Sequence, residues 1–377
     1  IGKEMDQRYI NDLTTISLSP ESIARHKDMK IVYTPIHGTG VEIVPAALKA
    51  FGFTNIIHVP EQDIISGDFP TVISPNPEEP AALAMAVQRA KDTDAELVLA
   101  TDPDADRVGA AVKNNEGEWV LLNGNQTALM FVYYLITRWK ELGKIKGNEY
   151  IVKTIVSTEL IRTIAERNGV ELYDVYTGFK WIAAIMKDNE GKKTFIGGGE
   201  ESYGFLCEDF VRDKDAVSAC TMLAETAAWA KDKGLTLYQL LQNIYVEYGF
   251  SKEAGISVVK KGKSGAEEIE AMMKHFRENP LTQIAGSNVT YVYDYATLKG
   301  LSVAENEKIT LDMPTTSNVI QYFTEDNTKV SIRPSGTEPK IKFYCEVHSK
   351  VKNLEELPAA ELAAQEKINQ IKISLGI

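Results

Sequence analysis

Residues 96–107 read ELVLATDPDADR. The largely apolar residues 96–100 predict a buried strand, and three aspartates follow it at alternate positions: Asp102, Asp104 and Asp106. Outward from this stretch, apolar runs alternate with segments of helical periodicity over most of the chain. That alternation predicts an α/β fold in which the acidic turn follows directly on a strand.

The surrounding segments predict two related α/β domains with mixed sheets. In the first, strands are expected at 31–34 and 56–59, helices at 41–51 and 80–91, and a hairpin formed by residues 108–112 and 119–122. In the second, strands are expected at 150–155, 172–176 and 194–197, and helices at 126–142, 159–168, 216–233 and 236–248. The second unit therefore looks like a variation on the plan of the first.

A smaller α+β domain is expected at the C-terminal end. The polar residues 249–255 predict a linker, followed by a strand at 256–260, a helix at 266–278, several further strands and an amphipathic helix at 359–373. We therefore expect domain boundaries at 1–122, 123–250 and 251–377.

Composition and charge argue against several classes of protein. The 377 residues carry 41 basic and 53 acidic side chains, a net charge of −12, which disfavours a nucleic-acid partner. No apolar run approaches the roughly 20 residues that cross a bilayer, so no membrane association is expected. The three widely spaced cysteines fit neither a zinc site nor a disulfide framework, which indicates a cytoplasmic protein.

The acidic turn predicts a divalent-metal site. Three carboxylates so close together need a cation to remain ionised, and hard oxygen ligands suit Mg²⁺ or Ca²⁺. An EF-hand is excluded because Arg107 stands where that loop needs glycine and Lys113 where it needs glutamate. Mg²⁺ in phosphoryl transfer is the favoured interpretation, and a solvated acidic turn is the alternative.

Two further loops indicate a phosphorylated sugar. Residues 333–340 (RPSGTEPK) offer a guanidinium, two hydroxyls and backbone N–H groups to one phosphate. Residues 198–204 (GGEESYG) suit hydrogen bonding to sugar hydroxyls, and Arg212 and Lys214 could bring positive charge to the same site. Taken singly, either loop could instead be a surface turn. His37 is a candidate general base, although a structural role is the commoner one for such a histidine.

Together these loops resemble those of the α-D-phosphohexomutase superfamily, the phosphoglucomutases and phosphomannomutases, over essentially the whole chain. The resemblance implies metal ligands at Asp102, Asp104 and Asp106, with Arg107 nearby. It assigns catalytic roles to Arg107 and Lys214, and it implies substrate-binding residues in the sugar loop and in the preceding turn, namely Thr177, Gly178, Lys180, Glu200 and Ser202. It also implies a phosphate-gripping loop consisting of Arg333, Ser335, Gly336 and Thr337.

The resemblance further implies a reaction. Hexose 1-phosphate and hexose 6-phosphate would be interconverted through a phosphoserine and a 1,6-bisphosphate, with Mg²⁺ and glucose 1,6-bisphosphate as cofactors. The family places its serine on a first domain in a Ser-His-Asn-Pro-type motif, and no such motif occurs here. We therefore expect a C-terminal three-domain fragment that is inactive alone.

Some alternatives stay open at this point. Tyr203, Gly204 and Phe205 follow the sugar-loop serine where phosphomannomutase-like members often place histidine, so the chain looks closer to the phosphoglucomutase branch and its general acid/base is unassigned. A phosphopentomutase-type mutase or a non-catalytic sugar-phosphate-binding protein remains possible. An aspartate phosphatase or a kinase is disfavoured because their motifs do not occur. The sequence does not indicate an oligomeric state.

Overall fold

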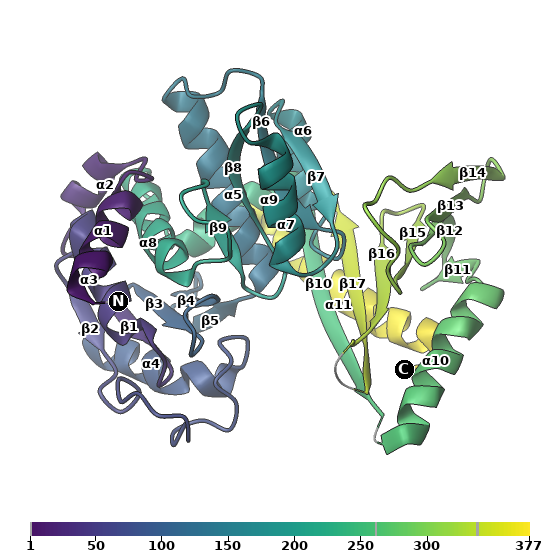
Figure 1. Cartoon of the computed structure of the whole chain (residues 1–377), viewed down its shortest axis with the longest axis horizontal. Coiled ribbons are helices and arrows are strands. Elements are labelled where there is room, and N and C mark those ends of the chain that lie inside the picture. Colours follow the sequence, from purple (N-terminus) through teal and green to yellow (C-terminus); the bar gives the residue numbers. More distant parts are fainter. Residues whose placement is uncertain (1, 261, 337–338) are drawn as a thin grey trace. The chain divides into compact units, whose positions relative to one another are not determined.

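The computed structural model describes residues 2–260, 262–336 and 339–377. The chain forms two compact units, Ile1–Ile244 and Tyr245–Ile377 (Figure 1). The domain boundaries expected at 1–122, 123–250 and 251–377 stay predictions. Within the described residues, no helix is long and apolar enough to cross a membrane.

The first sheet of the N-terminal unit contains the strand that precedes the acidic turn. Its order is β2-β1-β3-β4-β5, where β1 (Ile31–Thr34), β2 (Ile56–His58) and β3 (Leu97–Thr101) are parallel. The hairpin strands β4 (Val108–Lys113) and β5 (Trp119–Leu122) add antiparallel pairs. Helix α3 (Gly40–Phe51) connects β1 to β2, and α4 (Pro80–Thr93) connects β2 to β3. Small side chains of α4, Ala86 and Ala90, pack on Val32 and Val98 of the sheet.

The second sheet repeats this plan. Its order is β7-β6-β8-β9, with β6 (Glu149–Thr154), β7 (Glu171–Val175) and β8 (Thr194–Gly199) parallel and β9 (Phe205–Cys207) antiparallel. Helix α6 (Leu160–Arg167) follows β6, and α7 (Phe179–Asn189) packs over the sheet in a cluster with Tyr150, Val152 and Phe195. In both sheets the first strand lies between the second and the third, so the expected pair of related mixed α/β domains is confirmed.

Four helices pack around the two sheets of this unit. Helix α5 (Gly124–Glu141) contacts β8, and α8 (Ala216–Asp232) contacts α3, α5 and β9 (Figure 1). Helix α1 (Lys3–Thr14) lies on α3, and the short α2 (Pro20–Arg25) lies on α8. No element is among the sequence-based expectations for residues 3–25, and both helices there are stabilised by packing on α3 and α8. Helix α9 (Leu237–Tyr248) follows α8.

The C-terminal unit is an antiparallel sheet with two long helices, which confirms the expected α+β domain. The strand order is β10-β17-β16-β15-β12-β13-β14, and β11 (Gln283–Ile284) pairs with β12. The helices are α10 (Gly262–Glu278) and α11 (Leu357–Leu375), and the 3-10 helix η1 spans Leu354–Glu356. The strands are β10 (Phe250–Val259), β12 (Ser287–Asp294), β13 (Lys299–Ser302), β14 (Glu307–Thr310), β15 (Ile320–Thr324), β16 (Lys329–Pro334) and β17 (Lys340–Ser349).

The linker predicted at 249–255 is wrong. These residues belong largely to β10, which pairs with β17 from Phe250↔Ser349 to Val259↔Lys340. Because β10 lies at the edge of the sheet, Lys252, Glu253 and Ser257 are partly or fully exposed while its backbone completes the ladder. Sequence polarity therefore misidentified an edge strand as a connection.

Candidate functional site

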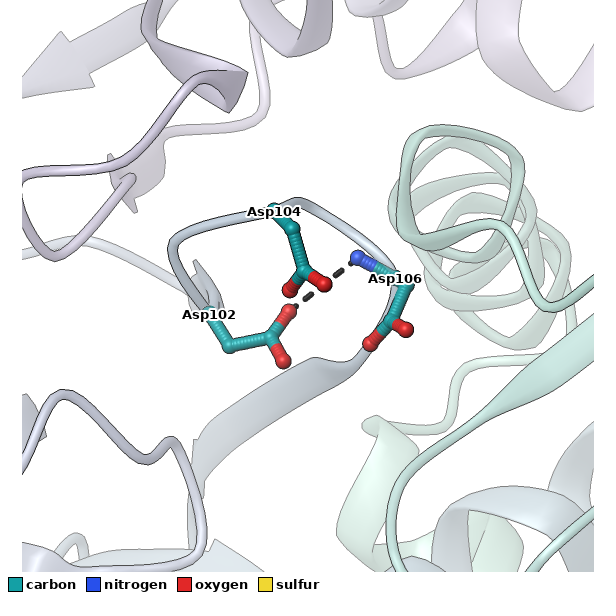
Figure 2. Close-up of side chains that lie close together, drawn as sticks. All are labelled: Asp102, Asp104 and Asp106. Atoms are coloured by element: carbon teal, nitrogen blue, oxygen red, sulfur yellow. Dashed lines mark hydrogen bonds between the residues drawn. The ribbon is translucent and has the colours of Figure 1, made fainter. Parts of the chain in front are cut away.

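The three aspartates converge on one point after β3. One ligand oxygen from each of Asp102, Asp104 and Asp106 lies within 4.8 Å of the others (Figure 2). Asp102 is buried, Asp106 is half-buried and Asp104 is exposed, so the cluster opens to solvent on one side. Carboxylate oxygens are the donors that Mg²⁺ and Ca²⁺ prefer, and the arrangement fits such an ion.

Asp102 also organises the loop itself. Its Oδ1 accepts hydrogen bonds from the backbone N–H groups of Asp106 at 3.1 Å and Arg107 at 2.9 Å (Figure 2 draws the first). Its Oδ2 accepts one from Nε of Arg107 at 2.6 Å. Because an ionised carboxylate offers about four lone-pair sites, these three bonds leave capacity for a metal ion.

Arg107 is held by carboxylates from two segments. Nη1 lies 3.8 Å from Oε1 of Glu78, and Nε lies 3.7 Å from Oδ1 of Asp106. Burial alone would lower the pKa of Arg107, but Asp102, Asp106 and Glu78 together raise it. The guanidinium therefore stays charged beside the three aspartates.

Lys214 reaches the same cluster from the segment before α8. Its Nζ lies 2.6 Å from Oδ2 of Asp106. Burial alone would lower the pKa of Lys214, whereas the hydrogen bond and charge of Asp106 raise it. Arg212 does not join the cluster, because its Nη2 pairs with Oε1 of Glu190 at 2.7 Å. Of the two cations expected near the site, the structure brings Lys214 to it.

Glu200 joins two predicted sugar-binding segments. These are residues 198–204, here called the sugar loop, and the turn at residues 177–180 that opens α7. Glu200 is nearly buried, and its Oε1 accepts a hydrogen bond from the Gly178 N–H at 2.7 Å, while its own N–H donates to the Gly204 carbonyl at 2.8 Å. Thr177 and Ser202, which are close in sequence to Gly178 and Glu200, are half-buried. Lys180 is exposed, and its Nζ lies 5.0 Å from the ring centroid of Trp181. The structure therefore joins two of the predicted sugar-binding segments.

The sugar loop also contacts the metal loop. Arg107 and Gly204 form an isolated antiparallel bridge, and the Val108 N–H donates to the Tyr203 carbonyl at 3.1 Å. The backbone links two motifs that lie far apart in the sequence and on different sheets. The loops that carry the predicted metal ligands and the predicted sugar-binding residues are therefore in direct backbone contact within the N-terminal unit.

Gly124, at the start of α5, packs closely against the sugar loop, and we expect this contact to require a glycine. A Cβ there would lie 1.9 Å from the Glu201 carbonyl oxygen, which is backbone and cannot rotate away. We expect Gly124→Ala to lower the free energy of unfolding by about 2 kcal/mol or more, measured by chemical denaturation. Gly67→Ala is the control, because a Cβ at Gly67 meets nothing within 4 Å. Equal denaturation midpoints for the two variants would contradict this close packing of α5 against the sugar loop.

The predicted phosphate loop lies in the C-terminal unit at the β16–β17 hairpin. Arg333 and Ser335 are half-buried and Gly336 is exposed, and the Ser335 N–H donates to the Lys340 carbonyl at 2.8 Å. Thr337, also predicted to bind phosphate, lies outside the described residues. In the strand register Arg333 is directly opposite Lys342.

His37 is occupied by structural contacts. Its ring nitrogens lie 2.7 Å from the Ile64 carbonyl and 2.8 Å from Oγ1 of Thr71. The side chain is buried and fastens the loop that follows β2. These contacts give no support to the general-base hypothesis for His37.

Sequence reasoning missed the partners that complete the metal loop. Asn76 and Glu78 approach Arg107 from the segment before α4, where Oδ1 of Asn76 lies 3.5 Å from Nη1 of Arg107. The run 74–80 (SPNPEEP) signals a loop through its prolines, but nothing in it indicates Arg107 as its neighbour.

Sequence models of one family match most of the chain. Residues 7–117 match phosphoglucomutase/phosphomannomutase α/β/α domain II, and residues 123–248 match α/β/α domain III. Residues 288–364 match the C-terminal domain of the same family. The three matches follow the order of the metal, sugar and phosphate loops.

Individual proteins agree with these matches. A phosphoglucomutase of Staphylococcus haemolyticus (strain JCSC1435) is 36% identical over 350 residues, which are 93% of this chain and 62% of that protein. A putative phosphomannomutase from Thermus thermophilus has a similar fold, with a TM-score of 0.64 at 19% identity over 96% of this chain and 66% of that one. An Aspergillus fumigatus N-acetylphosphoglucosamine mutase variant, solved with glucose 1,6-bisphosphate, has a TM-score of 0.54 at 12% identity over 98% of this chain and 66% of that one. The chain thus spans about three fifths of the curated relative's length, and it belongs to the phosphoglucomutase/phosphomannomutase family.

Proposed function

We propose that this chain acts as the metal-, sugar- and phosphate-binding portion of a phosphoglucomutase, which interconverts hexose 1-phosphate and hexose 6-phosphate through a phosphoserine and a 1,6-bisphosphate. The observation that carries the proposal is that the three aspartates, Arg107 and Lys214 lie together and that the loop of the aspartates and Arg107 forms a backbone bridge to the sugar loop. The name of the Staphylococcus relative and the glucose 1,6-bisphosphate bound to the Aspergillus relative support it.

Each group of side chains at this site has a role in the proposal. Asp102, Asp104 and Asp106 hold Mg²⁺, which when bound supplies positive charge for the transferring phosphoryl group. Arg107 and Lys214 keep further positive charge beside it. Glu200, oriented by the Gly178 N–H, accepts hydrogen bonds from sugar hydroxyls. Preorganised charges of this kind favour the transition state over the bound substrate.

The remaining predicted residues complete the substrate contacts. Ser202, Thr177 and Lys180 offer further donors to the sugar phosphate. No Ser-His-Asn-Pro motif occurs in the 377 residues, so in this proposal the phosphoserine comes from outside them. We also propose a cytoplasmic location, in keeping with three cysteines that are buried and free.

The register of the β16–β17 hairpin supports a phosphate at its loop. Arg333 and Lys342 are directly opposite each other, and like charges at such positions repel unless an anion lies near them. Ser335 and Gly336 follow Arg333 and offer a hydroxyl and backbone N–H groups to the same anion. In this proposal Thr337 adds a second hydroxyl, and the loop holds the phosphate that is not being transferred.

Calorimetric titration with glucose 1,6-bisphosphate in the presence of Mg²⁺ tests the proposal. Arg333→Ala is expected to weaken binding by about tenfold to a hundredfold, because it removes a charge-assisted contact to phosphate. Arg212→Ala is the control, since its guanidinium pairs with Glu190, and it should bind like the unaltered chain. Absence of binding by the unaltered chain at millimolar ligand, or an equal loss in both variants, would contradict the proposal.

A second candidate is a non-catalytic sugar-phosphate-binding protein, which would hold its ligand with the same sugar and phosphate loops. Turnover of glucose 1-phosphate by the protein that carries these residues in its cell separates the two, because only the mutase produces glucose 6-phosphate. A higher kcat/KM for pentose phosphate would instead favour a phosphopentomutase-type mutase.

A further inference from the structure

The start of helix α8 holds the metal loop at two points. The Ala216 N–H donates to the Ala105 carbonyl at 3.1 Å, and Nζ of Lys214 lies 2.6 Å from Oδ2 of Asp106. Ala105 has φ 58°, a left-handed conformation that is unfavourable for alanine. The contacts from α8 therefore keep the loop in a conformation that brings the three aspartates together.

Asp215 sets the position of these two contacts. It is the N-cap of α8, and its Oδ1 accepts a hydrogen bond from the Val217 N–H at 2.9 Å. Its own N–H donates to the Phe205 carbonyl at 3.1 Å, so the cap is tied to strand β9 next to the sugar loop. Since Asp215 lies between Lys214 and Ala216, any movement of the cap moves both contacts to the metal loop.

Helix α1 supplies a further partner of this cap, in addition to Val217 and Ser218 of α8 itself. The Tyr9 hydroxyl donates to Oδ2 of Asp215 at 2.6 Å, across 206 positions of sequence. The Tyr9 ring lies 6.0 Å from that of Phe210 between centroids. Burial and the neighbouring carboxylate raise the pKa of Tyr9, so its hydroxyl keeps the proton that it donates.

We propose that Tyr9 and Asp215 form a clamp that positions the metal loop through Lys214 and Ala105. The inference rests on the proposed function, in which Asp102, Asp104 and Asp106 bind a divalent cation. Tyr9 and Asp215 act as positioning residues. A loop that is already in its binding conformation loses less conformational entropy when the cation binds, so the clamp should raise cation affinity.

The same helix carries a matched control. Glu225, further along α8, accepts a hydrogen bond at Oε1 from the Tyr134 hydroxyl at 2.6 Å. Both residues are buried, and burial raises the pKa of Tyr134 as it does that of Tyr9. Tyr134→Phe therefore removes the same kind of bond from the same helix, but at the more buried pair and away from the cap.

The experiment compares the unaltered chain with Tyr9→Phe and Tyr134→Phe. Hydrogen exchange of peptides covering residues 102–108 reports on the loop, and titration with Mn²⁺ followed by electron paramagnetic resonance reports on the cation site. Tyr9→Phe is expected to speed exchange in this loop and to weaken Mn²⁺ binding by about threefold to tenfold. Tyr134→Phe is expected to lower the unfolding midpoint while leaving both readouts as in the unaltered chain.

Each outcome decides the proposal. Unchanged loop exchange in Tyr9→Phe, tighter Mn²⁺ binding in that variant, or equal changes in the two variants would overturn the clamp. If none of the three chains binds Mn²⁺, the metal site of the proposed function fails. Faster loop exchange in Tyr9→Phe alone would still support the clamp in that case.

Discussion

Replacing Asp102 with asparagine is expected to weaken divalent-metal binding by about a hundredfold or more and to destabilise the N-terminal unit. Removing a partner of a metal ligand typically weakens binding tenfold to a hundredfold, so removing a ligand should weaken it at least as much. The same change puts an amide NH₂ where the carboxylate accepts hydrogen bonds from Asp106 and Arg107. Because Asp102 is buried, the unsatisfied donors should lower the free energy of unfolding by about 2 to 3 kcal/mol.

Asp104→Asn separates the two effects. Asp104 contributes an oxygen to the same cluster but is exposed, so its replacement should weaken metal binding with little change in stability. Mn²⁺ titration and urea denaturation of both variants provide the comparison. If Asp102→Asn unfolds at the same urea concentration as the unaltered chain, the organising role of Asp102 is wrong. If both variants keep their Mn²⁺ affinity, the metal site is wrong.

Glu225→Gln is expected to be the most destabilising conservative change in helix α8. The buried carboxylate accepts hydrogen bonds from Ser17 Oγ at 2.5 Å, Leu18 N at 2.7 Å, Ser19 N at 3.0 Å and Tyr134 Oη at 2.6 Å. Three of these groups donate to Oε1, and the Ser17 hydroxyl donates to Oε2. An amide can place its carbonyl oxygen at Oε1, but it puts an NH₂ where Ser17 donates and it removes the negative charge that strengthens all four bonds. Burial raises the pKa of Glu225, and the four donors act against that rise.

The expected loss is about 2 to 3 kcal/mol, because buried hydrogen bonds lose the charge that strengthens them and the Ser17 bond must reverse. Chemical denaturation measures it, and hydrogen exchange of residues 15–20 should rise because that segment loses its anchor. Thr226→Val is the control. Thr226 is the next residue of the same helix and is equally buried, and its hydroxyl donates to the Met222 carbonyl within that helix at 2.7 Å. This variant should lose less than about 1 kcal/mol. Similar losses in the two variants would contradict the anchoring role of Glu225.

Much of the architecture could be predicted because the strands have local signatures. The apolar runs that became β1, β3 and β6 are buried on both faces of their sheets, so hydrophobicity alone marks them. Edge position obscures this signal, which is why the polar first half of β10 suggests a linker while only its second half, within 256–260, is predicted as a strand. Helices α1 and α2 escaped prediction because their stability depends on α3 and α8, which lie far away in the sequence.

The candidate site also contains residues that the sequence indicates and contacts that only the fold brings about. Asp102, Asp104 and Asp106 are close in sequence, so their spacing indicates a shared cation before any fold is known. Neither the bond between Glu200 and Gly178 nor the contact between Lys214 and Asp106 has a local signature. Both depend on loops that different strands and helices bring together.

The chemical groups of this protein and the alternation of its strands and helices depend on residue type and on periodicities of a few positions, so local sequence is enough to predict them. Which of these groups meet depends on the folded chain. Tyr9 reaches Asp215, Tyr134 and residues 17–19 surround Glu225, and Arg107 pairs its backbone with Gly204. Such pairings follow from the packing of whole helices and sheets, and packing depends on the sum of many weak contacts that no short stretch of sequence contains.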